Sequence, residues 1–283
     1  MIPAAFGYQR PSSLDEALRL IASDGGAKVL AGGQSLLPLL KLRLGAAETL
    51  IDIGRLSELK GYRSLPDGGV EIGALTTYAE WQASTQIPGI AEAIDHIADV
   101  QVRNRGTVGG SIAHADPASD MPAIALAFDA SAVLRGPGGE RVVPLDGFFQ
   151  GAFVSDIAQG EILVAIRRPK VADNAQFAYR KLANKASGYS VVGVAALIGS
   201  AGGKVTHARV AITGVGDVAY RAKAVEEALA GSDGSTAAIE AAAAHATDGI
   251  EVASDIHADR VYRTAMAVVY TRRAIEAALA RSS

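Results

Sequence analysis

Two glycine-containing segments, far apart in the chain, carry residue types suited to binding phosphate. One spans residues 101–120 and reads QVRNRGTVGGSIAHADPASD, and the other is Ala31-Gly-Gly-Gln-Ser35. Glycines such as Gly109 and Gly110 let successive backbone N–H groups approach an anion without a Cβ in the way. Because each segment could supply amides to one side of a pyrophosphate, the pair predicts a dinucleotide cofactor.

Polar side chains in these segments could complete such a site. Ser35 and Ser111 are expected to donate hydrogen bonds to phosphate, since no serine here lies in a nucleophile-elbow sequence. Asp116 is interpreted as the N-cap of a helix expected at 121–128. Asp120 could equally cap that helix or bind sugar hydroxyls. His114 has no second ligand at a metal-site spacing, so we expect a structural or hydrogen-bonding role and no metal site.

A third glycine motif, Gly214-Val-Gly-Asp-Val-Ala219, fits the dinucleotide fingerprint G-x-G-x-x-A after an expected strand. That fingerprint also requires a second parallel strand that ends in an acidic residue about twenty residues later. The sequence predicts another helix there instead. We therefore interpret the motif as a turn between a strand and a helix.

Composition narrows the functional classes. The chain has 283 residues, of which 49% are hydrophobic and 20% charged, with a net charge of −3. This length suits two or three lobes of a globular protein, and the charge gives no reason to expect nucleic acid as a partner.

The sequence contains no cysteine. It therefore has no disulfide, no thiolate nucleophile and no cysteine ligand for an iron–sulfur cluster. A redox centre would have to be organic or lie on a partner chain. The N-terminus lacks the pattern of a signal peptide and the longest apolar run, Val191 to Ile198, is too short to cross a bilayer, so we expect no transmembrane segment and a cytoplasmic location.

Hydrophobic periodicity divides the chain into three lobes, at 1–55, 56–170 and 171–283. The first is predicted to be α/β, with a helix that begins at a Ser13–Glu16 capping box and a glycine loop between strands 27–31 (buried) and 49–53. The second is predicted to be mixed, with strands 70–74, 132–134, 141–143 and 161–166 and helices 79–84 and 90–98. After a linker at 169–174, the third is predicted to have strands 177–182, 191–198 and 205–213, then helices 221–230, 236–246 and 259–280.

Four segments together resemble the FAD-binding medium subunit of the molybdenum hydroxylases: AGGQSLLP (31–38), LIDI (50–53), the 101–120 segment and GEIL (160–163). The similarity covers essentially the whole chain and is greatest to the carbon monoxide dehydrogenase type, within the broader xanthine dehydrogenase family. It implies an α+β protein. The expected fold is a two-lobed FAD domain of the vanillyl-alcohol-oxidase type, followed by a C-terminal lobe with a three-stranded antiparallel sheet and helices.

The resemblance also implies a set of FAD-binding residues. Those around the pyrophosphate are Lys28, Val29, Leu30, Ala31, Gly32, Gly33, Gln34, Ser35, Thr107, Val108, Gly109, Gly110 and Ser111. Asp120 would bind cofactor hydroxyls, Leu163 and Lys181 would lie along the FAD, and Tyr189 would lie beside the isoalloxazine ring. Many relatives have Asn in place of Ser111 and an acidic residue in place of Gly188, which affects the expected flavin contacts but not FAD binding. No catalytic residue and no metal ligand is implied for this chain.

In that family the medium subunit receives electrons that leave a molybdopterin-binding large subunit and cross two [2Fe–2S] clusters of a small subunit. It passes them to an external acceptor, and the implied assembly is a dimer of heterotrimers. Two alternatives are a free-standing FAD-dependent oxidoreductase with its own substrate and a nucleotide-binding module without redox function. The sequence leaves open the substrate (carbon monoxide, an aldehyde or a heteroaromatic ring), because that chemistry takes place on another chain. It also does not name the acceptor (quinone, NAD, cytochrome or oxygen).

Overall fold

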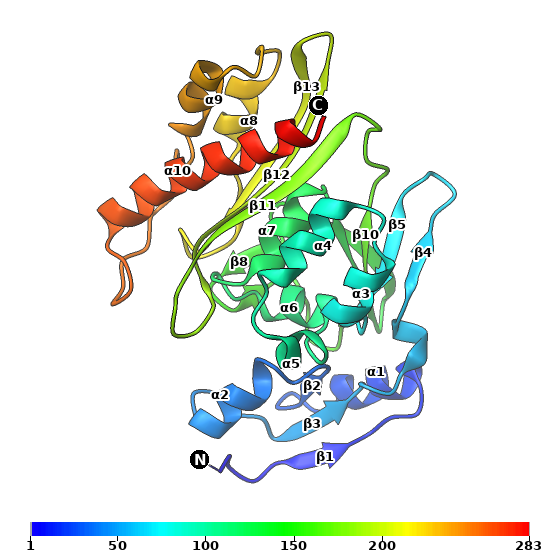
Figure 1. Cartoon of the computed structure of the whole chain (residues 1–283). Coiled ribbons are helices and arrows are strands. Elements are labelled where there is room, and N and C mark those ends of the chain that lie inside the picture. Colours follow the sequence, from blue (N-terminus) through cyan, green and yellow to red (C-terminus); the bar gives the residue numbers. More distant parts are fainter. Residues whose placement is uncertain (1, 283) are drawn as a thin grey trace.

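The computed structural model describes residues 2–282, and within them all side chains except those of Pro88 and Ser282. Figure 1 shows three sheet-containing parts stacked in chain order, from the N-terminal unit at the bottom to the C-terminal sheet and its helices at the top. They are called the N-terminal, central and C-terminal parts.

The N-terminal part is a small parallel sheet in the order β1-β3-β2. Its elements are β1 (Gly7–Gln9), α1 (Leu14–Ser23), β2 (Lys28–Leu30), α2 (Leu36–Leu42) and β3 (Thr49–Asp52). The Ser13 hydroxyl caps α1 at the Glu16 N–H, but the Glu16 carboxylate binds the Ser12 N–H, so the predicted capping box is shifted by one residue. The strand predicted to be buried at 27–31 is an edge strand with an exposed Lys28, because β3 occupies the centre of the sheet.

The central part is an antiparallel sheet in the order β4-β5-β10-β6-β7. Its elements are η1 (Ser57–Leu59), β4 (Tyr62–Ser64), β5 (Val70–Gly73), α3 (Tyr78–Ser84), α4 (Pro88–Asp95), α5 (Val100–Arg103), α6 (Val108–His114), α7 (Asp120–Ala127), β6 (Ser131–Gly136), β7 (Gly139–Pro144), β8 (Phe149–Gly151), β9 (Val154–Ser155) and β10 (Ile162–Arg168). Two hairpin turns are predicted from the sequence, at Pro66-Asp-Gly-Gly69 and Gly136-Pro-Gly-Gly139. Both are confirmed, by the pairing of Ser64 with Val70 and of Gly136 with Gly139.

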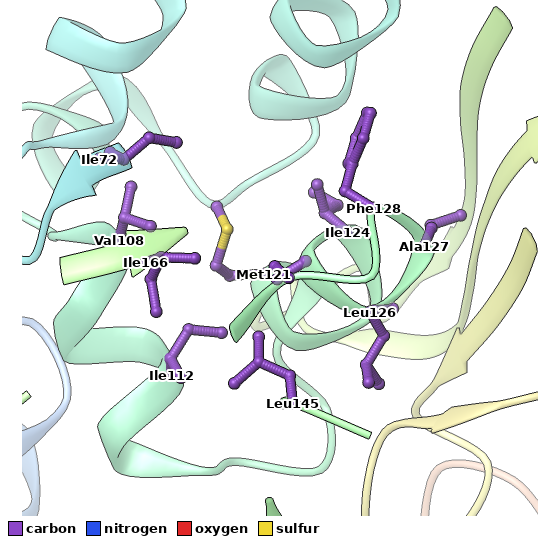
Figure 2. Packing of buried hydrophobic residues seen from close by; sticks show 14 of the residues in the cluster. Ile72, Val108, Ile112, Met121, Ile124, Leu126, Ala127, Phe128, Leu145 and Ile166 are labelled. Atoms are coloured by element: carbon purple, nitrogen blue, oxygen red, sulfur yellow. The ribbon is translucent and has the colours of Figure 1, made fainter. Parts of the chain in front are cut away.

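Helix α7 forms the centre of the largest core cluster. All eight of its residues are buried. Figure 2 shows Met121 beside side chains from α6, β5 and β10, including Ile112 and Ile166, and Ile124 beside Phe128. The opposite side of the helix packs on β12 and β13 of the C-terminal part. Since α7 is covered on both sides, its residues after Asp120 are all apolar and form no polar stripe.

The C-terminal part is an antiparallel sheet in the order β11-β12-β13-β14 with helices on one face. Its elements are β11 (Ala175–Ala183), β12 (Ser190–Ala201), β13 (Lys204–Thr213), β14 (Tyr220–Arg221), α8 (Lys223–Leu229), α9 (Thr236–Ala243), α10 (Arg260–Leu279) and η2 (Ala280–Ser282). The three predicted strands and three predicted helices are present, and the short β14 adds a fourth strand. The Gly214–Ala219 turn leads into β14 before α8, in an antiparallel context unlike a dinucleotide fold.

None of the helices within residues 2–282 combines the length and the apolar character needed to span a membrane.

Candidate functional site

A cavity of about 670 Å³ opens where the three parts meet. This volume lies within the usual range of small-molecule and cofactor sites. The cofactor-binding residues inferred from the sequence line it, with the exception of Leu30, Val108 and Lys181. Val108 instead packs into the main core with 1% exposure.

The two glycine segments meet backbone to backbone at this cavity. A Cβ on Gly32 would lie 2.0 Å from the carbonyl oxygen of Arg105. A Cβ on Gly109 would lie 2.4 Å from the Cβ of Ala74, at the end of β5. Both distances are impossible for a real side chain. Gly32 and Gly109 are therefore required so that the segments can pack together, a reason different from the ligand approach expected from the sequence.

The amides of the glycine turn in the 101–120 segment already have partners within the protein. In the first turn of α6, Val108 donates to the carbonyl of Thr76, Gly109 to the carbonyl of Ala74, and Gly110 to the hydroxyl of Thr107. These amides are not free to bind phosphate, contrary to the expectation.

In the segment 31–35, by contrast, backbone amides are unpaired. The N–H groups of Gly33, Gln34 and Ser35 find no acceptor among the residues that the structure describes, and Ser35 does not cap α2 with its side chain. Gly33 has φ +75°, a conformation that glycine adopts without strain. Unpaired amides that line a cavity need a partner, and an anion supplies one. The amides at 33–35 are therefore available to bind a pyrophosphate in the cavity.

The hydroxyl of Ser111 already has a partner within the protein. Its Oγ lies 2.7 Å from Oγ of Ser119, and both residues line the cavity. Ser119 is also the N-cap position of α7, so the prediction that Asp116 caps this helix is wrong. The Asp116 carboxylate instead accepts a hydrogen bond from the N–H of Ala118 at 2.9 Å, and burial raises the pKa of this carboxyl group.

Asp120 is the first residue of α7 and is 5% exposed. Its carboxylate accepts hydrogen bonds from the Tyr179 hydroxyl at 2.6 Å, the Ser190 hydroxyl at 2.8 Å and the Lys181 ammonium at 2.9 Å. Lys181 also donates to the carbonyl of His96 at 2.9 Å, and its side chain is 2% exposed. A carboxylate offers about four acceptor positions. The structure therefore leaves Asp120 room for about one cofactor hydroxyl, and it makes Lys181 a partner of Asp120 that does not line the cavity.

Tyr189 brings the C-terminal part to the cavity. It lies in the loop between β11 and β12, and it lines the cavity together with Ser187 and Gly188. The pKa of the Tyr189 phenol is raised, mainly by burial and then by the charge of Asp116, while an interaction with the Ser35 hydroxyl opposes the shift. A tyrosine of the C-terminal part thus lies close to the segment that holds the free amides.

Several residues that line the cavity were not assigned to the cofactor site from the sequence. His114 at the end of α6 packs against Phe153, with ring centroids 5.1 Å apart, and burial lowers the pKa of the His114 imidazole. Phe153 lies between the short strands β8 and β9, which have too few residues for a periodic pattern. Tyr78 and Gln159 also line the cavity. Neither belongs to a glycine motif, so no local signal marked them.

Comparisons with known proteins agree over the whole chain. The family model described as the FAD binding domain in molybdopterin dehydrogenase matches residues 4–171, and the CO dehydrogenase flavoprotein C-terminal domain matches residues 177–278. The chain is 43% identical over 286 residues to the carbon monoxide dehydrogenase medium chain of Hydrogenophaga pseudoflava, with 99% of each chain covered. It is 36% identical to the glyceraldehyde dehydrogenase medium chain of Sulfolobus acidocaldarius, with 98% of this chain and 99% of that one covered.

Solved structures give the same result. The carbon monoxide dehydrogenase from Hydrogenophaga pseudoflava that lacks the Mo-pyranopterin moiety superimposes with a TM-score of 0.96 at 44% identity, over 100% of both chains. The quinoline 2-oxidoreductase from Pseudomonas putida 86 superimposes with a TM-score of 0.93 at 33% identity, over 100% of this chain and 99% of that one. The fold class and the cofactor inferred from the sequence are confirmed, and the chain belongs to the family of FAD-binding medium subunits of the molybdenum hydroxylases.

Proposed function

We propose that this chain is the electron-transferring FAD subunit of a molybdenum hydroxylase, most similar to the carbon monoxide dehydrogenase type. The observation that carries the proposal is the cavity itself. It is enclosed by all three parts of the chain, and free amides at Gly33, Gln34 and Ser35 open into it. A long ligand with a central pyrophosphate fits this combination of shape and donors.

The residues of the chain would divide the work of holding FAD. The amides of 33–35 would bind the pyrophosphate, and one remaining acceptor position of Asp120 would take a cofactor hydroxyl. Leu163 of β10, 5% exposed, and Tyr189 would supply apolar and aromatic contacts. When bound, FAD supplies the capacity to accept and release electrons, which no side chain of this protein has.

The electrons would come from another chain. The sequence has no cysteine, so clusters of the [2Fe–2S] type would need ligands from a small subunit, which in turn would receive electrons from a molybdopterin-binding large subunit. We also propose the dimer of heterotrimers, an external acceptor, a cytoplasmic location, and the division of the chain at 1–55, 56–170 and 171–283.

The test is a reconstitution with and without the two partner subunits. The FAD-loaded chain alone should oxidise neither carbon monoxide nor an aldehyde nor a heteroaromatic substrate, although dithionite should bleach its flavin absorbance. Addition of both partners should allow one of these substrates to bleach the same absorbance. Substrate oxidation by the chain alone would refute the proposal and support a free-standing oxidoreductase.

A further inference from the structure

The segment 116–120 connects α6 to α7 and forms part of the cavity wall through Ser119 and Asp120. On its outer side it is held by the C-terminal sheet. The Thr213 hydroxyl lies 2.7 Å from the carbonyl oxygen of Pro117 and 2.8 Å from that of Ser119. Two backbone N–H groups of the same sheet also donate to the segment, from Gly214 to Pro117 at 2.8 Å and from Ser190 to Ala118 at 3.1 Å.

On its inner side the segment contacts the glycine helix α6. The hydroxyls of Ser119 and Ser111 are 2.7 Å apart, and both residues face the cavity. A continuous set of contacts therefore runs from Thr213 through Ser119 to Ser111. A shift of the segment relative to the C-terminal sheet would displace cavity-lining groups directly.

Thr213 itself is the last residue of β13, is 0% exposed, and does not line the cavity. The Ser119 carbonyl, at the N-cap of α7, accepts no hydrogen bond other than that of Thr213 among residues 2–282. The Thr213 hydroxyl thus satisfies a carbonyl that would otherwise be left without a partner at the start of a buried helix.

The neighbouring strand is adapted to this arrangement. Gly193 of β12 pairs with Thr213 across the sheet. A Cβ on Gly193 would lie 2.9 Å from Cγ2 of Thr213 and 2.2 Å from the Tyr179 hydroxyl that binds Asp120. The absence of a side chain at this position leaves room for both groups that hold the segment.

We propose that Thr213 is a positioning residue for the cofactor: its hydroxyl fixes the segment 116–120, and through this contact the C-terminal sheet sets the affinity of the cavity for FAD. The inference rests on the cavity as the FAD site and is independent of the identity of the partner subunits. It assigns a role in cofactor binding to a residue that does not touch the cavity.

The experiment compares three variants of the full chain. Thr213→Val keeps the shape but removes the donor, and Thr213→Ser keeps the donor. Thr271→Val is the matched control, because Thr271 is also 0% exposed in the C-terminal part and its hydroxyl finds no hydrogen-bond partner in the described part of the chain. The dissociation constant of FAD is measured by calorimetric titration of the apo-proteins, the visible circular dichroism of the bound flavin reports its surroundings, and thermal unfolding of the apo-proteins reports stability.

Thr213→Val should weaken FAD binding by about tenfold, the effect of one lost hydrogen bond, and should alter the flavin dichroism. Thr213→Ser should restore both, and Thr271→Val should match the wild type. If Thr213→Val lowers the apo-protein melting temperature but leaves FAD affinity and dichroism unchanged, the hydroxyl is only structural and the proposal is overturned.

If Thr213→Val does not fold, Ser190→Ala provides the test, because it removes one donor to Asp120 from the same sheet. Weaker FAD binding in this variant supports control of the site by the C-terminal sheet, and unchanged binding overturns it. Failure of the wild-type chain to bind FAD would instead refute the assignment of the cavity.

Discussion

The contact between the two glycine segments at Gly32 makes a quantitative prediction possible. An alanine Cβ at this position would lie 2.0 Å from the carbonyl oxygen of Arg105, 2.9 Å from its carbonyl carbon and 3.1 Å from Cα of Gly106. All three are backbone atoms, so no side-chain rotation can relieve the overlap. Gly32→Ala must therefore move one segment away from the other.

The size of this movement follows from the geometry. Real Cβ atoms essentially never approach another heavy atom closer than 3.0 Å, so the 2.0 Å contact requires a separation of at least 1 Å. Overpacking of this kind usually costs about 1–3 kcal/mol, and we expect the upper part of that range because only backbone can yield. The adjacent amides of Gly33, Gln34 and Ser35 would move with the segment. Since hydrogen bonds weaken steeply outside a range of a few tenths of an ångström, FAD affinity should fall by at least about tenfold.

Gly25→Ala is the matched control in the same part of the chain, because a Cβ there meets no atom within 4 Å. Urea unfolding of the apo-proteins would measure stability, and quenching of flavin fluorescence on titration would measure FAD binding. We expect a clear loss of both in Gly32→Ala and of neither in Gly25→Ala. A Gly32→Ala protein with wild-type stability and FAD affinity would show that the two segments do not need this close contact.

Two further predictions concern charged groups near the cavity. Lys181→Met should lower the free energy of unfolding by about 3–5 kcal/mol, because it leaves the buried Asp120 carboxylate without its cationic partner. Urea unfolding measures this loss, and the double variant Lys181→Met/Asp120→Asn should regain part of it. Burial lowers the pKa of His114 from its ordinary value of 6.5, so the fold favours the neutral imidazole, and its contribution to stability is complete above that value and lost as the pH falls below it. His114→Gln should therefore lose less stability than the wild type between about pH 7.5 and about pH 5.5, and an identical pH dependence of the unfolding midpoint would contradict this.

The long apolar segments were predictable from the sequence, whereas the shortest elements were not. Strands β12 and β13 are runs of 12 and 10 residues with many small and β-branched side chains, and glycine-rich turns mark their ends. Strand β1 has three residues, all exposed, and β14 has two. Such strands exist because a neighbouring strand offers free hydrogen-bonding groups, and this information is not local in the sequence.

The glycine segments were correctly located, but the sequence could not distinguish between two physical reasons for a glycine. At Gly33 the positive φ and the free amides agree with a role in ligand binding. At Gly32 and Gly109 the absence of a Cβ instead lets backbone approach backbone or a neighbouring strand. Both roles require glycine, so the three-dimensional structure is needed to show which amides remain available for a phosphate.

The polar contacts of Asp120 were out of reach for a different reason. Its three donors, on Tyr179, Lys181 and Ser190, follow 59 to 70 residues later in the chain and belong to another sheet. Local patterns made a helix cap and a cofactor ligand equally acceptable, and neither includes a buried ion pair between two parts of the protein. Because one carboxylate both faces the cavity and binds the C-terminal sheet, substitutions in that sheet should alter FAD binding even where they lie outside the glycine motifs. The glycine motifs identify the cofactor, but the contacts between the central and C-terminal parts fix the position of Asp120 in the cavity wall.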